Sequence, residues 1–414
     1  MAETARRIQS WINDRADEMA DTLVRLVACE TENPPGRGLA ECADVLHEEM
    51  DRLGLSPETL ELEPTSGIAE PRIVRGTVGD GDRLMYFHGH FDVVPVQDRA
   101  QFAAQRRDGT IVGRGTADMK GGIVSMLYGA AAAADLGLLD GGRVILHLVC
   151  DEETGSTVGS GYLRRHDLID SSAVAMLTAE QSGETIWNAA KGALSLRVDV
   201  HGRPVHVGQA SKGVNSFLKM LQIAAPLGEY AQQMSERHTS YTVGEDEAPG
   251  TMVVIGGLSG GGSNFNVVPG RSWFTVDGRF NPEEDLDTEL GRIADTVNAA
   301  AERSGAEVSI QVTQVAPSSD TRLDSAAATV LGECVAQVNR VPARFELCAG
   351  CLDTRWYSQL GIPAFGYGPG LFDVSHGPDE YVVEAALHRV AAVYGLYASR
   401  LLGRAVSASS DQTC

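Results

Sequence analysis

The stretch "FHGHFDVVP" (87–95) decides how the rest of the chain is interpreted. It closes the apolar run 84–87 and places His88, His90 and Asp92 at alternate positions. Alternate residues of a strand share one face, so these side chains are expected to point the same way. In open α/β sheets, sites form at the carboxyl ends of strands. The pattern predicts either a metal site or a core histidine followed by a turn aspartate.

Carboxylates follow other apolar or small-residue segments. "GRGTADMKGG" (113–122) places Asp118 just before a small-residue helix, where it could instead be a helix N-cap. "LVCDEETGS" (148–156) leads a buried strand into adjacent carboxylates that include Glu152 and Glu153. Adjacent carboxylates repel one another unless cations compensate, although a solvated loop would also tolerate them.

Two more candidates complete the pattern. "MLTAEQSG" (176–183) brings Glu180 directly after an apolar strand, and "GPGLFDVSHGPDEYV" (368–382) places His376 in a Gly/Pro loop before the last helix. Together these segments supply His90, Asp118, Glu152, Glu153, Glu180 and His376. Such a mixed nitrogen and oxygen set suits zinc, manganese or cobalt better than calcium or magnesium. Two ions about 3.5–4 Å apart could be held if one carboxylate bridges them, which leaves one carboxylate as a general base.

The composition excludes several function classes. The 414 residues carry a net charge of −22 (34 basic and 56 acidic side chains), which disfavours nucleic acid and anionic membranes as partners. The sequence has no apolar run of about 20 residues that could span a bilayer. The N-terminal segment lacks the continuous apolar core of a signal peptide. Seven scattered cysteines indicate no disulfide framework, so we expect a reduced, cytoplasmic protein.

Helix-like and strand-like segments alternate through the first half. We expect helices over 3–29, 38–54 and 118–137, and strands over 84–91 and 143–151. This alternation predicts an α/β fold with a mostly parallel sheet covered on both faces. In the middle of the chain the pattern of segments changes, and it predicts a compact, inserted unit of strands and helices. The expected organisation is a first catalytic part, an inserted domain and a second catalytic part, over 1–186, 187–303 and 304–414.

The chain resembles a known enzyme family in a series of motifs that keep the family's order. They are "HGHFDVVP", "GRGTADMKGG", "DEETGS", "AE" at 179–180, "GRPVHVG", "NVVPG", "DGRFNP", "LDTRW" and "SHGPDEYV". The family is that of the co-catalytic zinc amidohydrolases and peptidases, which includes succinyl-diaminopimelate desuccinylase, acetylornithine deacetylase, aminoacylase and glutamate carboxypeptidase. The resemblance implies a metallopeptidase-like mixed α/β sheet covered by helices, with an inserted α+β lid and dimerisation domain.

The resemblance also implies roles for the candidate residues. The metal ligands it implies are His90, Asp118, Glu153, Glu180 and His376. Asp118 would bridge the ions and be followed by a cis peptide bond to Met119. Asp92 would orient the imidazole of His90, Glu152 would be the general base, and His88 would be a packing residue.

Substrate contacts are implied in the same way. The residues concerned are His206, Asn266, Arg279, Asp353 and Arg355. His206 matches a histidine that polarises the scissile carbonyl, often in the partner subunit's site. Cys351 and Leu352 depart from the family's small or hydroxyl residues, which weakens the transfer of any particular substrate.

The expected activity is hydrolysis of the amide bond of an N-acyl amino acid by a water molecule that two divalent ions activate. Zinc is the first choice of metal, with cobalt or manganese as alternatives. A dipeptidase or carboxypeptidase would use the same machinery, and a non-catalytic metal-binding homologue is a further alternative. The substrate is expected to carry a free carboxylate, and the protein is expected to form a homodimer through the inserted domain.

Overall fold

A computed structural model describes residues 2–65, 67–245 and 247–403, and within them the chain forms a large and a small unit. The small unit comprises 189–320 and 346–355, and the large unit comprises the rest. The second boundary differs from the expected 303, because β12 (Glu307–Ala316) pairs with β9 (Gly192–His201) along almost its whole length. The expected mixed α/β architecture is confirmed.

The sheet of the large unit has the strand order β1-β2-β6-β3-β7-β15-β8. Its strands are β1 (Glu58–Glu61), β2 (Arg72–Gly79), β3 (Arg83–His90), β6 (Gly142–Val149), β7 (Met176–Thr178), β8 (Ile186–Ala190) and β15 (Ala364–Gly366). β3 runs parallel to β6 and β7, and β15 runs parallel to β7. β2 is antiparallel to β6, and β8 is antiparallel to β15. The sheet is therefore parallel in its centre and mixed overall.

Several further strands are short, and β13 follows β8 in the same order. They are β4 (Gln105–Arg107), β5 (Thr110–Val112), β13 (Ser319–Asp320), β14 (Phe345–Cys348) and β16 (Tyr381–Val383). β16 pairs with β5, and β5 pairs with β4. The β16 pairing ties the chain just after "SHGPDE" to the chain just before "GRGTADM".

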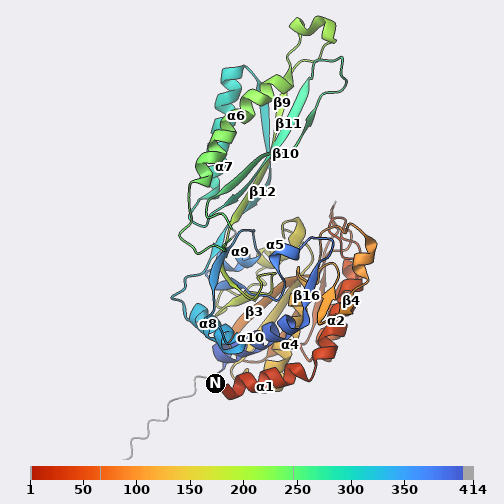
Figure 1. Cartoon of the computed structure of the whole chain (residues 1–414), viewed down its shortest axis with the longest axis vertical. Helices are drawn as coiled ribbons and strands as arrows, with labels where there is room; N and C mark the ends of the chain where they lie inside the picture. Colours follow the sequence, from red (N-terminus) through yellow and green to blue (C-terminus); the bar gives the residue numbers. More distant parts are fainter. Residues whose placement is uncertain (1, 66, 246, 404–414) are drawn as a thin grey trace, which may run out of the picture. The chain divides into compact units, whose positions relative to one another are not determined.

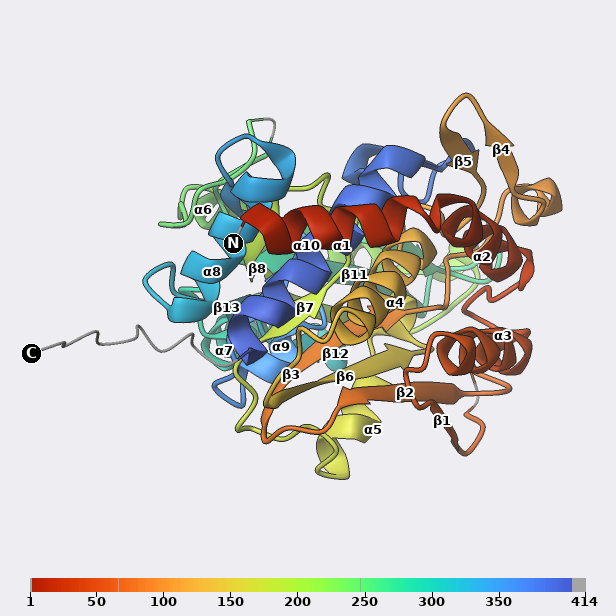
Figure 2. The same ribbon diagram turned by 90° about the horizontal axis from the view of Figure 1, so that it is seen from below.

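Helices cover both faces of the large sheet. They are α1 (Ala2–Asn13), α2 (Ala16–Ala28), α3 (Leu39–Arg52), α4 (Lys120–Asp135), α5 (Ser160–Arg165), α8 (Ala326–Asn339), α9 (Thr354–Ser358) and α10 (Glu384–Leu402). Met85 and Phe87 of β3 join the core cluster that contains α4 and α10, whereas Leu84 and Tyr86 join the cluster on the opposite face. Figure 2 shows α1, α4 and α10 layered against the sheet.

The small residues of α4 permit close helix packing. A side-chain carbon added at Gly129 would lie 2.6 Å from the carbonyl oxygen of Ala391 in α10, so the two backbones nearly touch. The α4 helix is buried on almost every side, which explains its uniformly apolar sequence. The segment expected as one helix over 3–29 forms two helices that turn at 14–15, and each half buries its own apolar face.

The small unit has the strand order β10-β11-β9-β12. Its remaining elements are α6 (Ser216–Ser235), β10 (Met252–Gly261), β11 (Arg271–Phe280) and α7 (Leu286–Ser304). Alternate residues of β9 and β11, such as Val198 and Phe274, are buried in the cluster shared with α6 and α7. Figure 1 shows both helices along one face of this sheet.

The structure bears on the expectations about membrane spans and disulfides. None of the helices in the described part of the chain is long and apolar enough to cross a membrane. The cysteines of the described residues are all free thiols, and Cys414 lies outside those residues.

Candidate metal centre

The ends of neighbouring strands bring the candidate ligands to one edge of the large sheet. His90 ends β3, Glu153 follows β6 and Glu180 follows β7. β3 runs parallel to both of the other strands, so all three carboxyl ends lie together. Asp118 arrives from the loop before α4, and His376 from the loop before β16.

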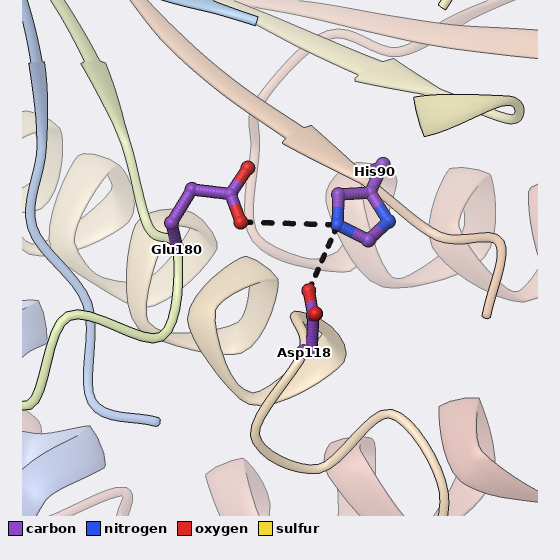
Figure 3. Close-up of side chains that lie close together, drawn as sticks. All are labelled: His90, Asp118 and Glu180. Carbon is purple, nitrogen blue, oxygen red and sulfur yellow. Dashed lines mark hydrogen bonds and ion pairs between the residues drawn. The ribbon is translucent and has the colours of Figure 1, made fainter. Parts of the chain in front are cut away.

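Asp118 occupies the centre of the cluster. Its Oδ1 lies 3.0 Å from Nε2 of His90, and its Oδ2 lies 3.0 Å from Nε2 of His376. Gln181 donates to Oδ2 from 2.9 Å. Glu180 Oε2 lies 3.9 Å from His90 Nε2 on the other side (Figure 3). The peptide bond between Asp118 and Met119 is cis, as the resemblance implied.

Two groups of side chains in the described residues have ligand atoms close enough to hold a metal ion. One is His90, Asp118 and Glu180, and the other is Asp118, Glu153 and His376. In each group, the ligand atoms lie within 4.8 Å of one another. The groups share Asp118, whose two oxygens face different imidazoles. This arrangement could hold two divalent ions with Asp118 between them.

Charge in the cluster is high and mostly buried. Burial disfavours the ionised form of Asp118, but hydrogen bonds from His376 and His90 outweigh it and lower the pKa of the carboxyl. Hydrogen bonds to Asp118 and Glu153 raise the pKa of His376 to about 10. Burial opposes protonation of His90, yet its contacts with Asp118 and Asp92 hold its pKa well above the usual value. The carboxylates therefore favour positive charge on both imidazoles.

The donor chemistry of the cluster fits divalent cations. Burial and the charge of Asp118 raise the pKa of Glu153. Within the described residues, Glu153 Oε1 is buried and accepts no well-formed hydrogen bond, and it makes an ion-pair contact with His376 Nε2 at 3.3 Å. Metal ions displace protons from such ligands when they bind. Two ions in place of the imidazole protons would satisfy this oxygen and neutralise the carboxylates.

Asp92 organises the cluster from behind. His90 Nδ1 lies 3.1 Å from the Asp92 carbonyl oxygen, and donation there leaves Nε2 free to bind a metal. The Asp92 carboxylate accepts from the backbone N–H groups of Glu152 and Glu153, each at 3.2 Å. Asn33 Nδ2 donates to the same carboxylate from 3.0 Å. Asp92 thus connects His90 to the loop that carries the predicted base, and Glu152 is half-buried in that loop.

His88 has a different environment from His90. Its Nδ1 lies 3.0 Å from the hydroxyl of Tyr357, and the same hydroxyl lies 2.9 Å from Nδ1 of His147. All three side chains are buried. His88 therefore packs against Tyr357 in the buried interior and is not in either ligand group.

The predicted substrate residues lie in the small unit. His206 caps a short turn, where its Nδ1 accepts from the backbone N–H of Gly208 at 3.1 Å. The carbonyl of Asn266 accepts from the N–H of Val207 at 2.8 Å, so His206 and Asn266 lie on neighbouring segments. Arg279 lies on β11 and pairs with Asp277 at 2.7 Å.

The other substrate candidates are paired with one another. Arg355 is 3% exposed, and its Nη1 lies 3.3 Å from Asp353 Oδ1. The same nitrogen contacts Cys351 Sγ at 3.4 Å and donates to the carbonyl of Leu352 at 2.9 Å. The two residues that depart from the family's motif therefore surround Arg355.

Residues 86–400 match the family model described as Peptidase family M20/M25/M40. This chain belongs to that family. It is 29% identical to a succinyl-diaminopimelate desuccinylase of Gluconacetobacter diazotrophicus over 373 residues, which cover 84% of this chain and 89% of the relative. The family match confirms the resemblance seen in the motifs. The family consists of hydrolases.

Solved structures share the fold. Human carnosine dipeptidase 1 superposes with a TM-score of 0.77 at 15% identity, covering 96% of this chain and 99% of that one. A Bacillus subtilis protein described as a dinuclear metal binding peptidase of the M20 family superposes with a TM-score of 0.67 at 14% identity. That match covers 94% of this chain and 99% of the other.

Some residues of the centre were not predicted. Asn33 and Gln181 contact Asp92 and Asp118, and neither carries a local signal beyond its place in a loop. Arg114 and Glu380 stand inside two of the quoted motifs, and they form a buried ion pair next to Asp118. Their places in those motifs were the available signal.

Removal of metal should destabilise the large unit. We expect chelator-treated protein to unfold at a lower temperature, and zinc at about 100 times its Kd to stabilise the protein by about 2.7 kcal/mol. Asp118→Asn should abolish most of this shift, because both groups lose a charged ligand. Glu49→Gln is the matched control: Glu49 is buried, but its carboxylate accepts hydrogen bonds from Thr22, Arg52 and Tyr128, away from the ligand groups. A normal zinc shift in Asp118→Asn would contradict the assignment of Asp118.

Proposed function

We propose that this member of the family hydrolyses the amide bond of an N-acyl amino acid at a dinuclear metal centre. The proposal depends chiefly on Asp118, whose two oxygens face two separate imidazoles and belong to both candidate ligand groups. The relationship to a desuccinylase supports a deacylase in preference to a peptidase. Zinc is the proposed metal, with cobalt or manganese as alternatives.

Each residue of the centre has a proposed task. Two bound ions would supply Lewis acidity, which lowers the pKa of water and polarises a carbonyl. Glu152 would take a proton from the attacking water and deliver it to the leaving nitrogen. Asp92 supports this role, since its carboxylate holds the backbone N–H groups of Glu152 and Glu153. His206 would donate to the carbonyl oxygen as negative charge develops there.

Two alternatives use the same residues. A dipeptidase or carboxypeptidase would need no change in the ligand groups, and the fold shared with carnosine dipeptidase 1 is compatible with it. A non-catalytic metal-binding protein would have no use for a carboxylate beside the ligands, so the presence of Glu152 next to Glu153 favours an enzyme.

Replacement of the proposed base separates metal binding from catalysis. Glu152→Gln should keep the wild-type metal content, measured by elemental analysis, while kcat falls by roughly 10²–10⁴. The physical reason is that the amide keeps the shape of the side chain but cannot accept the proton. Glu63→Gln, at an exposed glutamate of the same unit, should leave kcat unchanged. A near-normal rate in Glu152→Gln would refute the base assignment, and the elemental analysis identifies the bound metal.

A substrate panel separates deacylase from peptidase. We expect N-acetyl and N-succinyl amino acids to be hydrolysed with a higher kcat/KM than dipeptides. The carboxamide of the best substrate should lose at least tenfold in kcat/KM, because an arginine fork binds a carboxylate with two charge-assisted hydrogen bonds. Arg279→Met and Arg355→Met should remove this preference if either side chain binds the carboxylate. Faster cleavage of dipeptides would favour the peptidase alternative.

A homodimer through the small unit is also part of the proposal. Large apolar side chains lie exposed on one stretch of α6, namely Phe217, Leu218 and Leu221 at 47%, 56% and 50% exposure. Exposed apolar clusters of this kind favour association. A cytoplasmic location is supported by the free thiols of the described residues and is tested by cell fractionation.

Subunit complementation tests the dimer together with His206. Chains with His206→Ala and chains with Glu152→Gln should each be nearly inactive. Mixed by co-expression, they should regain part of the activity, because one site of a mixed dimer then has both intact residues. Sedimentation should give twice the 44.0 kDa of one chain. A dimer that regains no activity would show that His206 does not act across subunits.

A further inference from the structure

A buried ion pair lies directly behind the candidate metal centre. Arg114 Nη1 lies 2.5 Å from Glu380 Oε2, and each residue is 1% exposed. Neither side chain belongs to a ligand group, and neither has a task in the proposed reaction. A buried ion pair is weak evidence for stability, because desolvation of the charges offsets much of their attraction. The contacts of the pair therefore need another explanation.

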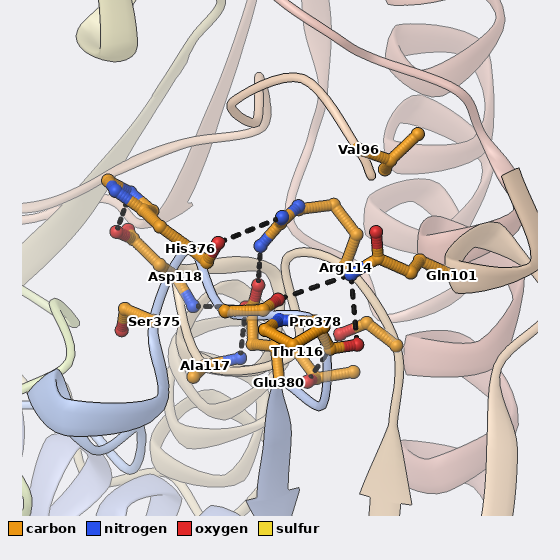
Figure 4. A network of polar contacts seen from close by, with 12 residues as sticks. Val96, Gln101, Arg114, Thr116, Ala117, Asp118, Ser375, His376, Pro378 and Glu380 are labelled. Carbon is orange, nitrogen blue, oxygen red and sulfur yellow. Dashed lines mark hydrogen bonds and ion pairs between the residues drawn. The ribbon is translucent and has the colours of Figure 1, made fainter. Parts of the chain in front are cut away.

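Glu380 holds the backbone that carries Asp118. Its Oε1 accepts from the N–H of Ala117 at 2.9 Å and from the N–H of Asp118 at 3.1 Å (Figure 4). Its main-chain carbonyl accepts from the N–H of Gly113 at 2.9 Å. The loop 113–118 thus wraps around one glutamate, and the main chain of Asp118 is fixed by a charged acceptor.

Arg114 holds the backbone that carries His376. Its Nη2 donates to the carbonyl of His376 at 3.2 Å and to Oε1 of Gln97 at 3.1 Å. Gln97 Nε2 donates to the same carbonyl at 3.2 Å. His376 has a φ of +63°, in the left-handed region that residues with a side chain rarely adopt. Two donors on its carbonyl oppose relaxation of this conformation.

Gln101 holds the residues that follow His376 in the same loop. Its Nε2 donates to the carbonyls of Gly377 and Pro378 at 3.2 and 3.1 Å. Its Oε1 accepts from the N–H of Gln97 at 2.9 Å. The loop 376–378 is therefore held by side chains from 97–114, and Figure 4 shows Gln101 and Arg114 beside this loop.

We propose that Arg114 and Glu380 are positioning residues that set the distance between Asp118 and His376. One member of the pair holds the main chain of Asp118, the other holds that of His376, and the short contact between them fixes both. The ion bound by Asp118, Glu153 and His376 should therefore depend on the pair more than the ion bound by His90, Asp118 and Glu180. This inference rests on the proposed function, because it requires the dinuclear centre.

The test measures zinc affinity without reference to catalysis. Zinc is titrated into apo-protein against a chromophoric chelator. Glu380→Gln keeps an oxygen for the two N–H groups but removes the counter-charge of Arg114, so one zinc ion should bind 10–100-fold more weakly, as for other residues that orient metal ligands. The second zinc ion should be weakened less, because its group contains Asp118 but not His376.

A milder variant and a control accompany it. Gln97→Ala changes an exposed side chain and removes one donor to the His376 carbonyl, so it should weaken the same ion by less than Glu380→Gln. Glu49→Gln changes a buried carboxylate with an arginine partner elsewhere in the large unit, and it should leave both affinities unchanged. If Glu380→Gln fails to fold, the zinc titration of Gln97→Ala tests the positioning role.

The outcomes separate this inference from the proposed function. Wild-type titration curves for both Glu380→Gln and Gln97→Ala would overturn the positioning role, and so would equal weakening of the two ions in a folded variant. Wild-type protein that binds two zinc ions but cleaves no substrate of the panel would refute the proposed function and leave the positioning role in place. Wild-type protein that binds neither zinc, cobalt nor manganese would overturn both.

Discussion

The repulsion among buried carboxylates is the constraint that shapes this protein. Asp118, Glu153 and Glu180 converge on a small, poorly solvated space, and Asp92 lies directly behind them. Charges of one sign in such a space cost free energy unless positive charge or hydrogen-bond donors compensate. The surroundings provide both: two imidazoles, backbone N–H groups on Asp92 and Glu380, and the guanidinium of Arg114. Divalent ions would complete this compensation, and their binding would then be coupled to local folding.

The rest of the large unit offsets the cost of this crowding by burying apolar side chains in its core. The parallel strands β3, β6 and β7 end at one edge, and each is buried on both faces. The close packing of α4 on α10 anchors the helix that begins just after Asp118. The strands and helices behind the centre are apolar and buried, whereas His90 lies at the last position of β3 and the other ligands lie in loops. A rigid support under polar loops is what an arrangement of fixed charges requires.

Much of this could be predicted from the sequence because the signals are local. An apolar run followed by a carboxylate or histidine predicts a strand end, and it brought His90, Glu153 and Glu180 into consideration. The mixed pairing of the sheet was less predictable, because the sequence of β2 indicates a strand but not whether that strand is parallel or antiparallel to its neighbour. The Arg114–Glu380 pair was missed for a related reason: its members are far apart in sequence, and only the β16–β5 pairing brings their segments together. Single residues indicate chemistry, but contacts between distant segments need the fold.

Specificity is a separate physical problem from the chemistry of the centre. Both arginines that could bind a substrate carboxylate already face one, Asp277 for Arg279 and Asp353 for Arg355. A substrate carboxylate would have to share the guanidinium or displace its partner, and a shared guanidinium between two carboxylates binds each more weakly than it binds one. Arg279 is 34% exposed at its side chain and can exchange partners in water, whereas Arg355 is nearly buried beside Cys351 and Leu352. Of the two arginines, Arg279 is therefore the better candidate for direct contact with a substrate carboxylate. Cys351 and Leu352 contact the guanidinium of Arg355 and so influence its position.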